Sequence, residues 1–283
     1  MTRRTFARET GATGVALHAG VPATFTLHPA APGTGIVFRR SDVSAQNPIP
    51  ALWSNVVETR LGTVIEGADG ASVGVVEHLM AALAGAEIDD GVIAVDGPEP
   101  PILDGDALSF LKIVDEAGVS EQEGGLPQLH VRLPVEVTHG NASCRLLPAS
   151  SLAFHFEIDF DSPAIGHQEF EHAFSAESFR ADIAPARTFG FLKEAETLRA
   201  MGLARGADLT NTLVIDGDGL ANPGLRRFTD EFVRHKILDA VGDMKLAGLP
   251  LVARFEGRRS SHALNNALLR ALFADPANYE ILP

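Results

Sequence analysis

His235 and Asp239 lie four residues apart in the segment Asp230-Glu-Phe-Val-Arg-His-Lys-Ile-Leu-Asp-Ala-Val-Gly-Asp243. On an α-helix this spacing places the imidazole and the carboxylate on one face, and Asp243 extends that face by one turn. A separate apolar stripe suits a core and consists of Val233, Ile237, Ala240, Val241 and Met244. Two neutral imidazoles and one carboxylate are a common zinc-binding set in hydrolases, with one position left open. The pattern predicts a metal site whose third ligand comes from elsewhere in the chain.

The best candidate for that third ligand is the pair Glu77-His78 in the first half of the chain. Adjacent residues on a helix point about 100° apart. Both can therefore serve one centre only at the edge of the helix, where one binds the metal and the other reaches the attacking water. Each motif alone also fits an ordinary surface ion pair. His262 likewise fits a solvated helix start, with Ser260 or Ser261 as the N-cap.

Composition excludes several classes of protein. The chain has 283 residues, of which 45% are hydrophobic and 21% charged, as in an ordinary globular protein. Its formal charge of -14 argues against nucleic acid or an anionic membrane as a partner, since both require a basic surface. Cys144 is the single cysteine, which excludes an internal disulfide and indicates a cytoplasmic setting. We expect no signal peptide and no membrane span.

The elements that must position these side chains fall on both sides of a linker predicted at residues 121–127, which is polar and rich in glycine. It separates a first domain, 1–120, from a second, 128–283. Strands are expected near 13–18, 23–28, 35–39, 52–66 and 91–96, and after the linker near 128–138, 142–147, 152–160, 167–174, 186–191, 211–215 and 250–256. Helices are expected near 74–84, 107–117, 176–182, 193–201, 229–247 and 261–273. Strands precede helices in each half, which predicts an α+β fold with helices on one face of each sheet.

An internal echo connects the two halves. Residues 76–85 and 233–242 both place a histidine near the start of an apolar helix that ends in or contains glycine. If the echo reflects a repeat, two similar domains each bring a helix and a histidine to their shared interface. Clefts between domains are frequent sites of ligand binding and catalysis.

Six short motifs occur in order along nearly the whole chain. They are Gly14-Val-Ala-Leu-His18-Ala-Gly20, Val76-Glu77-His78-Leu79, Pro101-Ile-Leu-Asp104-Gly105, Arg187-Thr-Phe-Gly-Phe191, Phe232-Val-Arg-His235-Lys-Ile-Leu-Asp239-Ala-Val-Gly-Asp243 and His262-Ala-Leu-Asn265. Together they resemble the UDP-3-O-acyl-N-acetylglucosamine deacetylase family, the zinc amidases of lipid A biosynthesis. The resemblance implies two α+β domains packed helix layer to helix layer in a β-α-α-β sandwich.

The resemblance also implies a metal centre. His78, His235 and Asp239 would bind Zn²⁺, and the same ligands accept Fe²⁺. Glu77 looks like the base that deprotonates the attacking water.

Further catalytic groups follow from the same resemblance. His262, with Asp243 beside it, is similar to the group that steadies the oxyanion and helps the amine leave. Thr188 is similar to the hydroxyl that assists at the oxyanion. The helix N-terminus would lower the pKa of His262 and Asp243 would raise it. Either Glu77 serves as base and then acid, or Glu77 and His262 divide these roles.

Substrate contacts are implied in the same way. Phe189 and Phe191 would line the cleft, Lys236 would face the sugar or the diphosphate, and the segment 159–165 is similar to a family insert. The full set of residues implied to contact the substrate is Lys236, Phe189, Phe191, Phe160, Arg259 and Leu61, with Phe160 and Arg259 on the two faces of the uracil.

Three positions depart from the family pattern. Ser261 replaces the usual Gly before the catalytic His, Val75 replaces a Thr, and Asp106 replaces a Ser. If position 261 requires a positive φ, the loop in this chain must differ.

The expected function is a cytoplasmic, zinc-dependent deacetylase that acts on a UDP-linked, 3-O-acylated N-acetylglucosamine and releases acetate. One alternative is an amidase of the same fold with a shifted sugar-nucleotide or acyl preference. Another is a catalytically silent binding protein, which the intact candidate residues argue against. Acyl chain length, protein partners and oligomeric state stay open.

Overall fold

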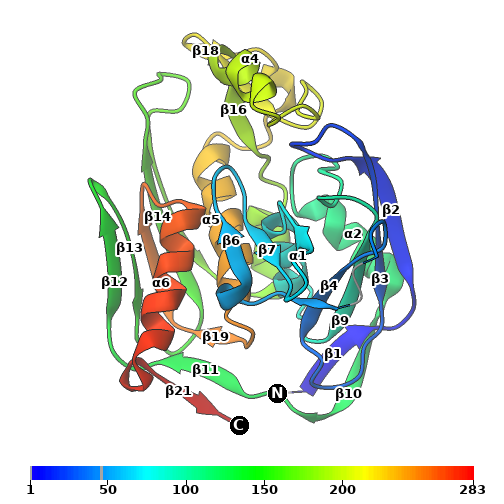
Figure 1. The fold of residues 1–283 in the computed structure, drawn as a ribbon. Helices are drawn as coiled ribbons and strands as arrows, with labels where there is room; N and C mark the ends of the chain where they lie inside the picture. Colours follow the sequence, from blue (N-terminus) through cyan, green and yellow to red (C-terminus); the bar gives the residue numbers. More distant parts are fainter. Residues whose placement is uncertain (1, 45–46) are drawn as a thin grey trace.

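Two mixed sheets of five strands form the outer layers of the molecule, and the main helices lie between them (Figure 1). The computed structural model describes residues 2–44 and 47–283. The arrangement confirms the predicted α+β sandwich with its helix layers facing each other. Among the described residues, no helix is both long and apolar enough to cross a membrane.

The first sheet has the strand order β2-β3-β9-β4-β5. These strands are β2 (Thr10–Val15), β3 (Pro22–His28), β9 (Gly91–Val95), β4 (Ile36–Arg40) and β5 (Ile49–Pro50). Along β3, Ala23, Phe25 and Leu27 are buried while their neighbours are not, because successive side chains of a strand point to opposite faces. Helices α1 (Glu77–Gly85) and α2 (Leu108–Ala117) cover the buried face.

The second sheet has the strand order β12-β13-β20-β14-β15. These strands are β12 (Val135–His139), β13 (Ala142–Leu147), β20 (Arg254–Arg258), β14 (Ala153–Asp159) and β15 (His167–Ala173). Helices α5 (Glu231–Lys245) and α6 (His262–Ala274) cover its inner face.

The two sheets share one topology. Each has a single parallel pair at the equivalent place, β4 with β9 and β14 with β20, and its other neighbours are antiparallel. Helix α1 precedes β9 as α5 precedes β20. The two similar segments, 76–85 and 233–242, therefore occupy equivalent positions in the two halves. The predicted pair of similar domains is confirmed at the level of topology.

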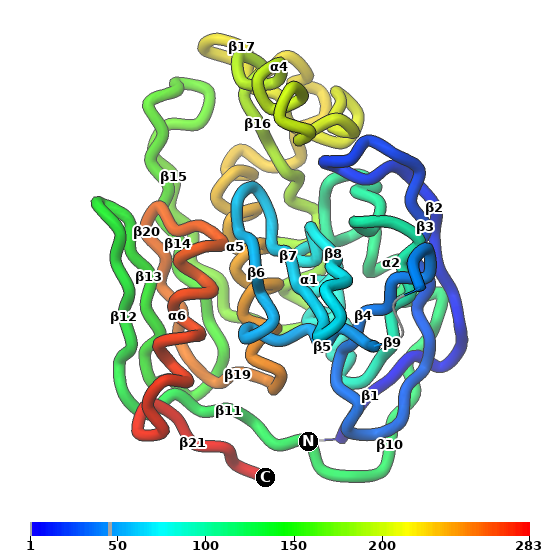
Figure 2. Tube along the Cα trace, viewed as in Figure 1, coloured from blue at the N-terminus to red at the C-terminus, as the bar shows by residue number. Residues whose placement is uncertain are grey.

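Helices α1 and α5 cross in direct contact at the centre of the molecule (Figure 2). A Cβ placed on Gly242 would lie 2.0 Å from the backbone oxygen of Glu77. Only glycine allows this approach, because any other side chain would push the two backbones apart. The close crossing places the start of α1 against the C-terminal half of α5.

Each half carries an insert before its central helix. In the first half, β6 (Val56–Glu58), β7 (Val64–Glu66) and β8 (Ser72–Val73) form a small sheet. In the second half, β16 (Phe189–Phe191), β17 (Leu213–Asp216) and β18 (Gly219–Leu220) form another, joined by α4 (Leu192–Ala200), at the top of Figure 1.

The remaining elements are short. They are β1 (Thr2–Phe6), β10 (Val119–Gly125), β11 (Gln128–Val131), β19 (Leu251–Val252), β21 (Tyr279–Leu282), α3 (Ala176–Ser178), a π-helical turn η2 (Phe179–Ile183), and the 3₁₀ turns η1 (Trp53–Asn55), η3 (Pro223–Leu225) and η4 (Pro276–Asn278).

Several predicted elements differ in the structure. The strands expected near 128–138 and 250–256 are each divided between two sheets, the first into β11 and β12 and the second into β19 and β20. The strand expected over 52–66 is divided into η1, β6 and β7, because Leu61 (φ 61°) and Gly62 (φ 153°) turn the chain. Much of the predicted linker lies within β10, which pairs antiparallel with β1 at the other end of the first half. We propose the same division into 1–120 and 128–283, since β10 pairs with the first half and β11 with β19 and β21 of the second.

Candidate active site

His78 of α1 meets His235 and Asp239 of α5 at the helix crossing. Asp239 Oδ1 lies 3.6 Å from Nε2 of His78 and 3.4 Å from Nε2 of His235. The two imidazole rings are 5.0 Å apart and nearly perpendicular. Each of the three side chains is at least 95% buried. The structure thus brings together the three predicted metal ligands.

The donor set fits a divalent metal. Tetrahedral zinc with ligand distances of about 2.0–2.1 Å has ligand atoms about 3.3–3.4 Å apart, close to the observed separations. His235 Nδ1 lies 3.1 Å from the Ala186 carbonyl, which fixes the tautomer whose Nε2 lone pair faces the other two ligands. Within residues 2–44 and 47–283, this is the one group of three or more such side chains that could hold a metal ion.

Electrostatics favours the ligating forms of these side chains. Burial lowers the pKa of His235 to about 3, against the opposing effect of Asp239, so its imidazole is neutral. Burial would raise the pKa of Asp239, but His235 and Lys236 outweigh it and hold that pKa well below its ordinary value. Lys236 Nζ donates to Asp239 Oδ2 at 2.6 Å, so the predicted substrate lysine is also bound to a metal-ligand candidate.

Glu77 lies beside this triad at the start of α1. The backbone N–H of Thr63 donates to its Oε2 at 2.9 Å, and its Oε1 lies 3.8 Å from His262 Nε2. Burial raises the pKa of Glu77, while His262 and His78 act in the opposite direction. A carboxylate with a raised pKa is a better proton acceptor at neutral pH.

His262 stands at the first turn of α6 and is held by Asp243. Its Nδ1 lies 2.9 Å from Asp243 Oδ2, which also accepts from Asn265 Nδ2 at 2.9 Å. Burial lowers the pKa of His262, but Asp243 and Glu77 overcome it and raise the pKa to about 9. In the metal-free protein the effect of the carboxylates on this pKa therefore exceeds that of burial.

Thr63 was not among the predicted site residues. Its backbone binds Glu77, and its hydroxyl donates to Asp243 Oδ1 at 2.6 Å across 180 positions of the chain. It is 1% exposed. A lone threonine after a turn has no sequence pattern that would single it out, whereas Asn265 already lay within a recognised motif.

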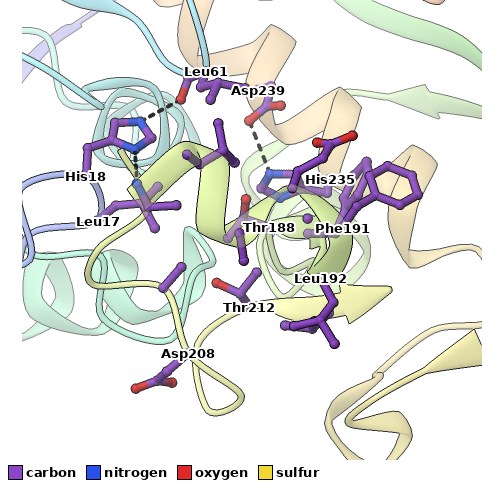
Figure 3. A pocket seen from close by; sticks show the side chains of 18 of the residues that line it. Leu17, His18, Leu61, Thr188, Phe191, Leu192, Asp208, Thr212, His235 and Asp239 are labelled. Atoms are coloured by element: carbon purple, nitrogen blue, oxygen red, sulfur yellow. Dashed lines mark hydrogen bonds and ion pairs between the residues drawn. The ribbon is translucent and has the colours of Figure 1, made fainter. Parts of the chain in front are cut away.

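The site opens into a cavity of about 590 Å³. Glu77 and His262 line this cavity. So do six other predicted site residues, which are Thr188, Phe189, Phe191, Phe160, Leu61 and Lys236. Figure 3 shows Thr188, Phe191 and Leu61 around it with His235 and Asp239.

Two predicted residues lie outside the lining of this cavity. Asp243 sits behind His262, and the guanidinium of Arg259 pairs with Asp159. Phe160, the other residue implied to flank the uracil, packs against two further aromatic rings. Its ring centroid lies 5.9 Å from that of Phe189 and 6.1 Å from that of Phe191.

Two of the three departures from the family pattern, Ser261 and Asp106, have local explanations. Ser261 has φ −143°, an extended conformation open to any residue, and its hydroxyl caps α6 by accepting from the Leu264 N–H. Position 261 thus does not require a positive φ. Val75 adopts φ 53°, a conformation unusual for a β-branched residue. Asp106 is fully buried, pairs with Arg227 and accepts from the N–H of Ser109 at the start of α2.

Known proteins resemble this chain over almost its full length. A model of the UDP-3-O-acyl N-acetylglycosamine deacetylase family matches residues 3–274. Relatives named UDP-3-O-acyl-N-acetylglucosamine deacetylase include the following three. The relative from Myxococcus xanthus is 47% identical, covering 99% of this chain and 89% of its own. The relative from Phenylobacterium zucineum is 49% identical, covering 95% and 92%, and that from a Nitratiruptor species is 44% identical, covering 100% and 94%.

Proposed function

Because this chain belongs to the UDP-3-O-acyl-N-acetylglucosamine deacetylase family, we propose that it hydrolyses the N-acetyl amide of UDP-3-O-acyl-N-acetylglucosamine and releases acetate. This is an early committed step of lipid A biosynthesis, and we place it in the cytoplasm. The observation that carries the proposal is the meeting of His78, His235 and Asp239 at the crossing of α1 and α5, with Glu77 beside them at the wall of one large cavity.

His78, His235 and Asp239 hold the metal, which we take to be Zn²⁺, with Fe²⁺ as the alternative. The buried, neutral imidazole of His235 and the ionised carboxylate of Asp239 support this assignment. A divalent metal at such a site polarises the amide carbonyl and lowers the pKa of water. The protein's own residues supply the proton transfers and the orientation.

Glu77 takes the proton from the attacking water, since its buried carboxylate faces the triad and its pKa is raised. We assign the proton to His262, since Asp243 and Glu77 raise its pKa to about 9 in the metal-free protein. It donates a hydrogen bond to the oxyanion and then its proton to the leaving amine. This geometry favours the division of roles in which Glu77 is the base and His262 the acid.

Thr188 supplies a further hydrogen bond to the oxyanion. Its backbone N–H donates to the Gly105 carbonyl at 2.8 Å, and its carbonyl accepts from the Leu213 N–H at 2.9 Å. A Cβ on Gly105 would lie 1.9 Å from the Asn211 backbone oxygen, so the loop of the first half packs closely beside Thr188. Such rigid support suits a group that must be in place before charge develops.

The cavity accounts for the substrate contacts. We propose that Phe189, Phe191 and Leu61 contact apolar parts of the substrate and that Lys236 faces the sugar or diphosphate. Phe160 and Arg259 flank the uracil, which requires the Arg259 guanidinium to turn from Asp159 when substrate binds.

Removal of one metal ligand tests this function. His235→Ala should abolish both the bound metal and the release of acetate from the acylated substrate, and a chelator should inhibit the unaltered protein. His155→Ala, on the outer face of the second sheet, is the control and should change neither. Full metal content in His235→Ala, measured by elemental analysis, would contradict the ligand assignment.

A further inference from the structure

His18, in the turn after β2, forms hydrogen bonds to two segments that are distant from it in the sequence, one at Leu61 and one at Ala204. Its Nε2 lies 2.8 Å from the Leu61 carbonyl, as Figure 3 shows, and the Ala204 N–H donates to its Nδ1 at 3.2 Å. A backbone N–H can only donate and a carbonyl can only accept. The two contacts therefore define a neutral imidazole that carries its proton on Nε2.

Backbone contacts surround this bridge. The Arg205 N–H donates to the His18 carbonyl at 3.2 Å, and the Gly206 N–H donates to the Leu17 carbonyl at 2.9 Å. A Cβ on Gly206 would lie 2.2 Å from the Ala16 oxygen. We call residues 16–20, Leu61 and residues 204–206 the clasp. It fastens the insert of the second half to the first half, backbone against backbone.

The insert depends on the clasp for its position. No residue of α4 is buried, so this helix has little apolar anchoring of its own. Leu198 of α4 lines the cavity together with four members of the clasp, which are Leu17, His18, Leu61 and Ala204. A displaced clasp would therefore widen the apolar part of the cavity, while the metal ligands on α1 and α5 would stay in place.

We propose that His18 is a positioning residue that holds the insert closed over the apolar cavity and so sets the preference for a 3-O-acylated substrate. The inference rests on the proposed function, because it takes the apolar cavity as the site of the acyl chain. The inference assigns the preference for an acylated substrate to a hydrogen-bonded junction between the two halves of the protein, as well as to the side chains that contact the acyl chain.

The test compares a variant inside the cavity with one outside it. His18→Phe keeps a flat ring and removes both hydrogen bonds, whereas Gly206→Ala disrupts the same junction and does not line the cavity. Both should raise KM for UDP-3-O-acyl-N-acetylglucosamine at least tenfold. Gly206→Ala should leave the metal content, and any turnover of unacylated UDP-N-acetylglucosamine, within twofold of the unaltered protein.

Two results would overturn the proposal. One is an unchanged acyl preference in both variants. The other is a loss of preference in His18→Phe alone, because His18 would then act only by touching the substrate.

Amide hydrogen exchange provides a measurement that does not depend on activity. Exchange at Ala204, Arg205 and Gly206 should become at least tenfold faster in His18→Phe, and unchanged protection would contradict the clasp. If the unaltered protein shows these protected amides and does not deacetylate the acylated substrate, the proposed function fails while the clasp stands.

Discussion

Gly242→Ala tests whether the helix crossing builds the metal site. The added Cβ would lie 2.0 Å from the Glu77 backbone oxygen, whereas ordinary contact begins at 3.4 Å. The two backbones must therefore separate by about 1.4 Å, the difference between these distances. His78 moves with Glu77, while His235 stays on the other helix. The separation between the two sets of ligands would grow by a similar amount.

The expected losses follow from that displacement. Tetrahedral zinc requires ligand atoms about 3.3–3.4 Å apart, so the variant cannot satisfy all three ligands without strain. We expect metal affinity to fall at least about 100-fold, and a misplacement of about 1 Å alone can lower the rate about 100-fold. Overpacking of this kind costs about 1–3 kcal/mol of stability.

Three measurements check this reasoning: metal dissociation by competition with a chelator, kcat at saturating metal, and thermal unfolding. Gly85→Ala is the matched control, since its Cβ would lie 2.2 Å from the ring of Phe179 at the far end of α1. It should lose stability and keep its metal. If Gly242→Ala binds metal and turns over like the unaltered protein, the crossing does not set the ligand geometry.

Three further predictions concern single side chains. Glu77→Gln should keep its metal and lose about 10²–10⁴-fold in kcat, whereas His78→Ala should lose the metal itself; the reverse pattern in elemental analysis would show that the two roles are exchanged. Lys236→Ala should raise KM for the UDP-sugar more than Arg259→Ala, and the KM of the unaltered protein should rise with ionic strength; a KM that ignores both would place the diphosphate elsewhere. His262 has a folded-state pKa of about 9 against 6.5 when unfolded, so in the metal-free protein its contribution to stability is fully present below 6.5 and is lost as pH rises through 9. The free energy of unfolding lost in His262→Gln should therefore shrink over this range, and a loss that grows with pH would refute the sign.

Local geometry explains what could be predicted from the chain alone. Residues four apart on a helix share a face whatever surrounds them, so His235 and Asp239 were recognisable as a pair before any fold was known. The order of the expected strands and helices in each half predicted the α+β layers. Glu77-His78 was the candidate for the third ligand, and the family resemblance then assigned separate roles to Glu77, His78 and His262.

Tertiary structure alone decided which distant groups meet. Thr63 reaches Asp243 across 180 positions, and His18 reaches Ala204 across 186, and neither contact follows from a repeating pattern. The same holds for β10, whose polar residues predict a linker until β1 supplies the backbone partners. Backbone hydrogen bonds and close glycine contacts depend on the positions of two segments in the folded protein. The packing of both sheets around one helix layer determines those positions.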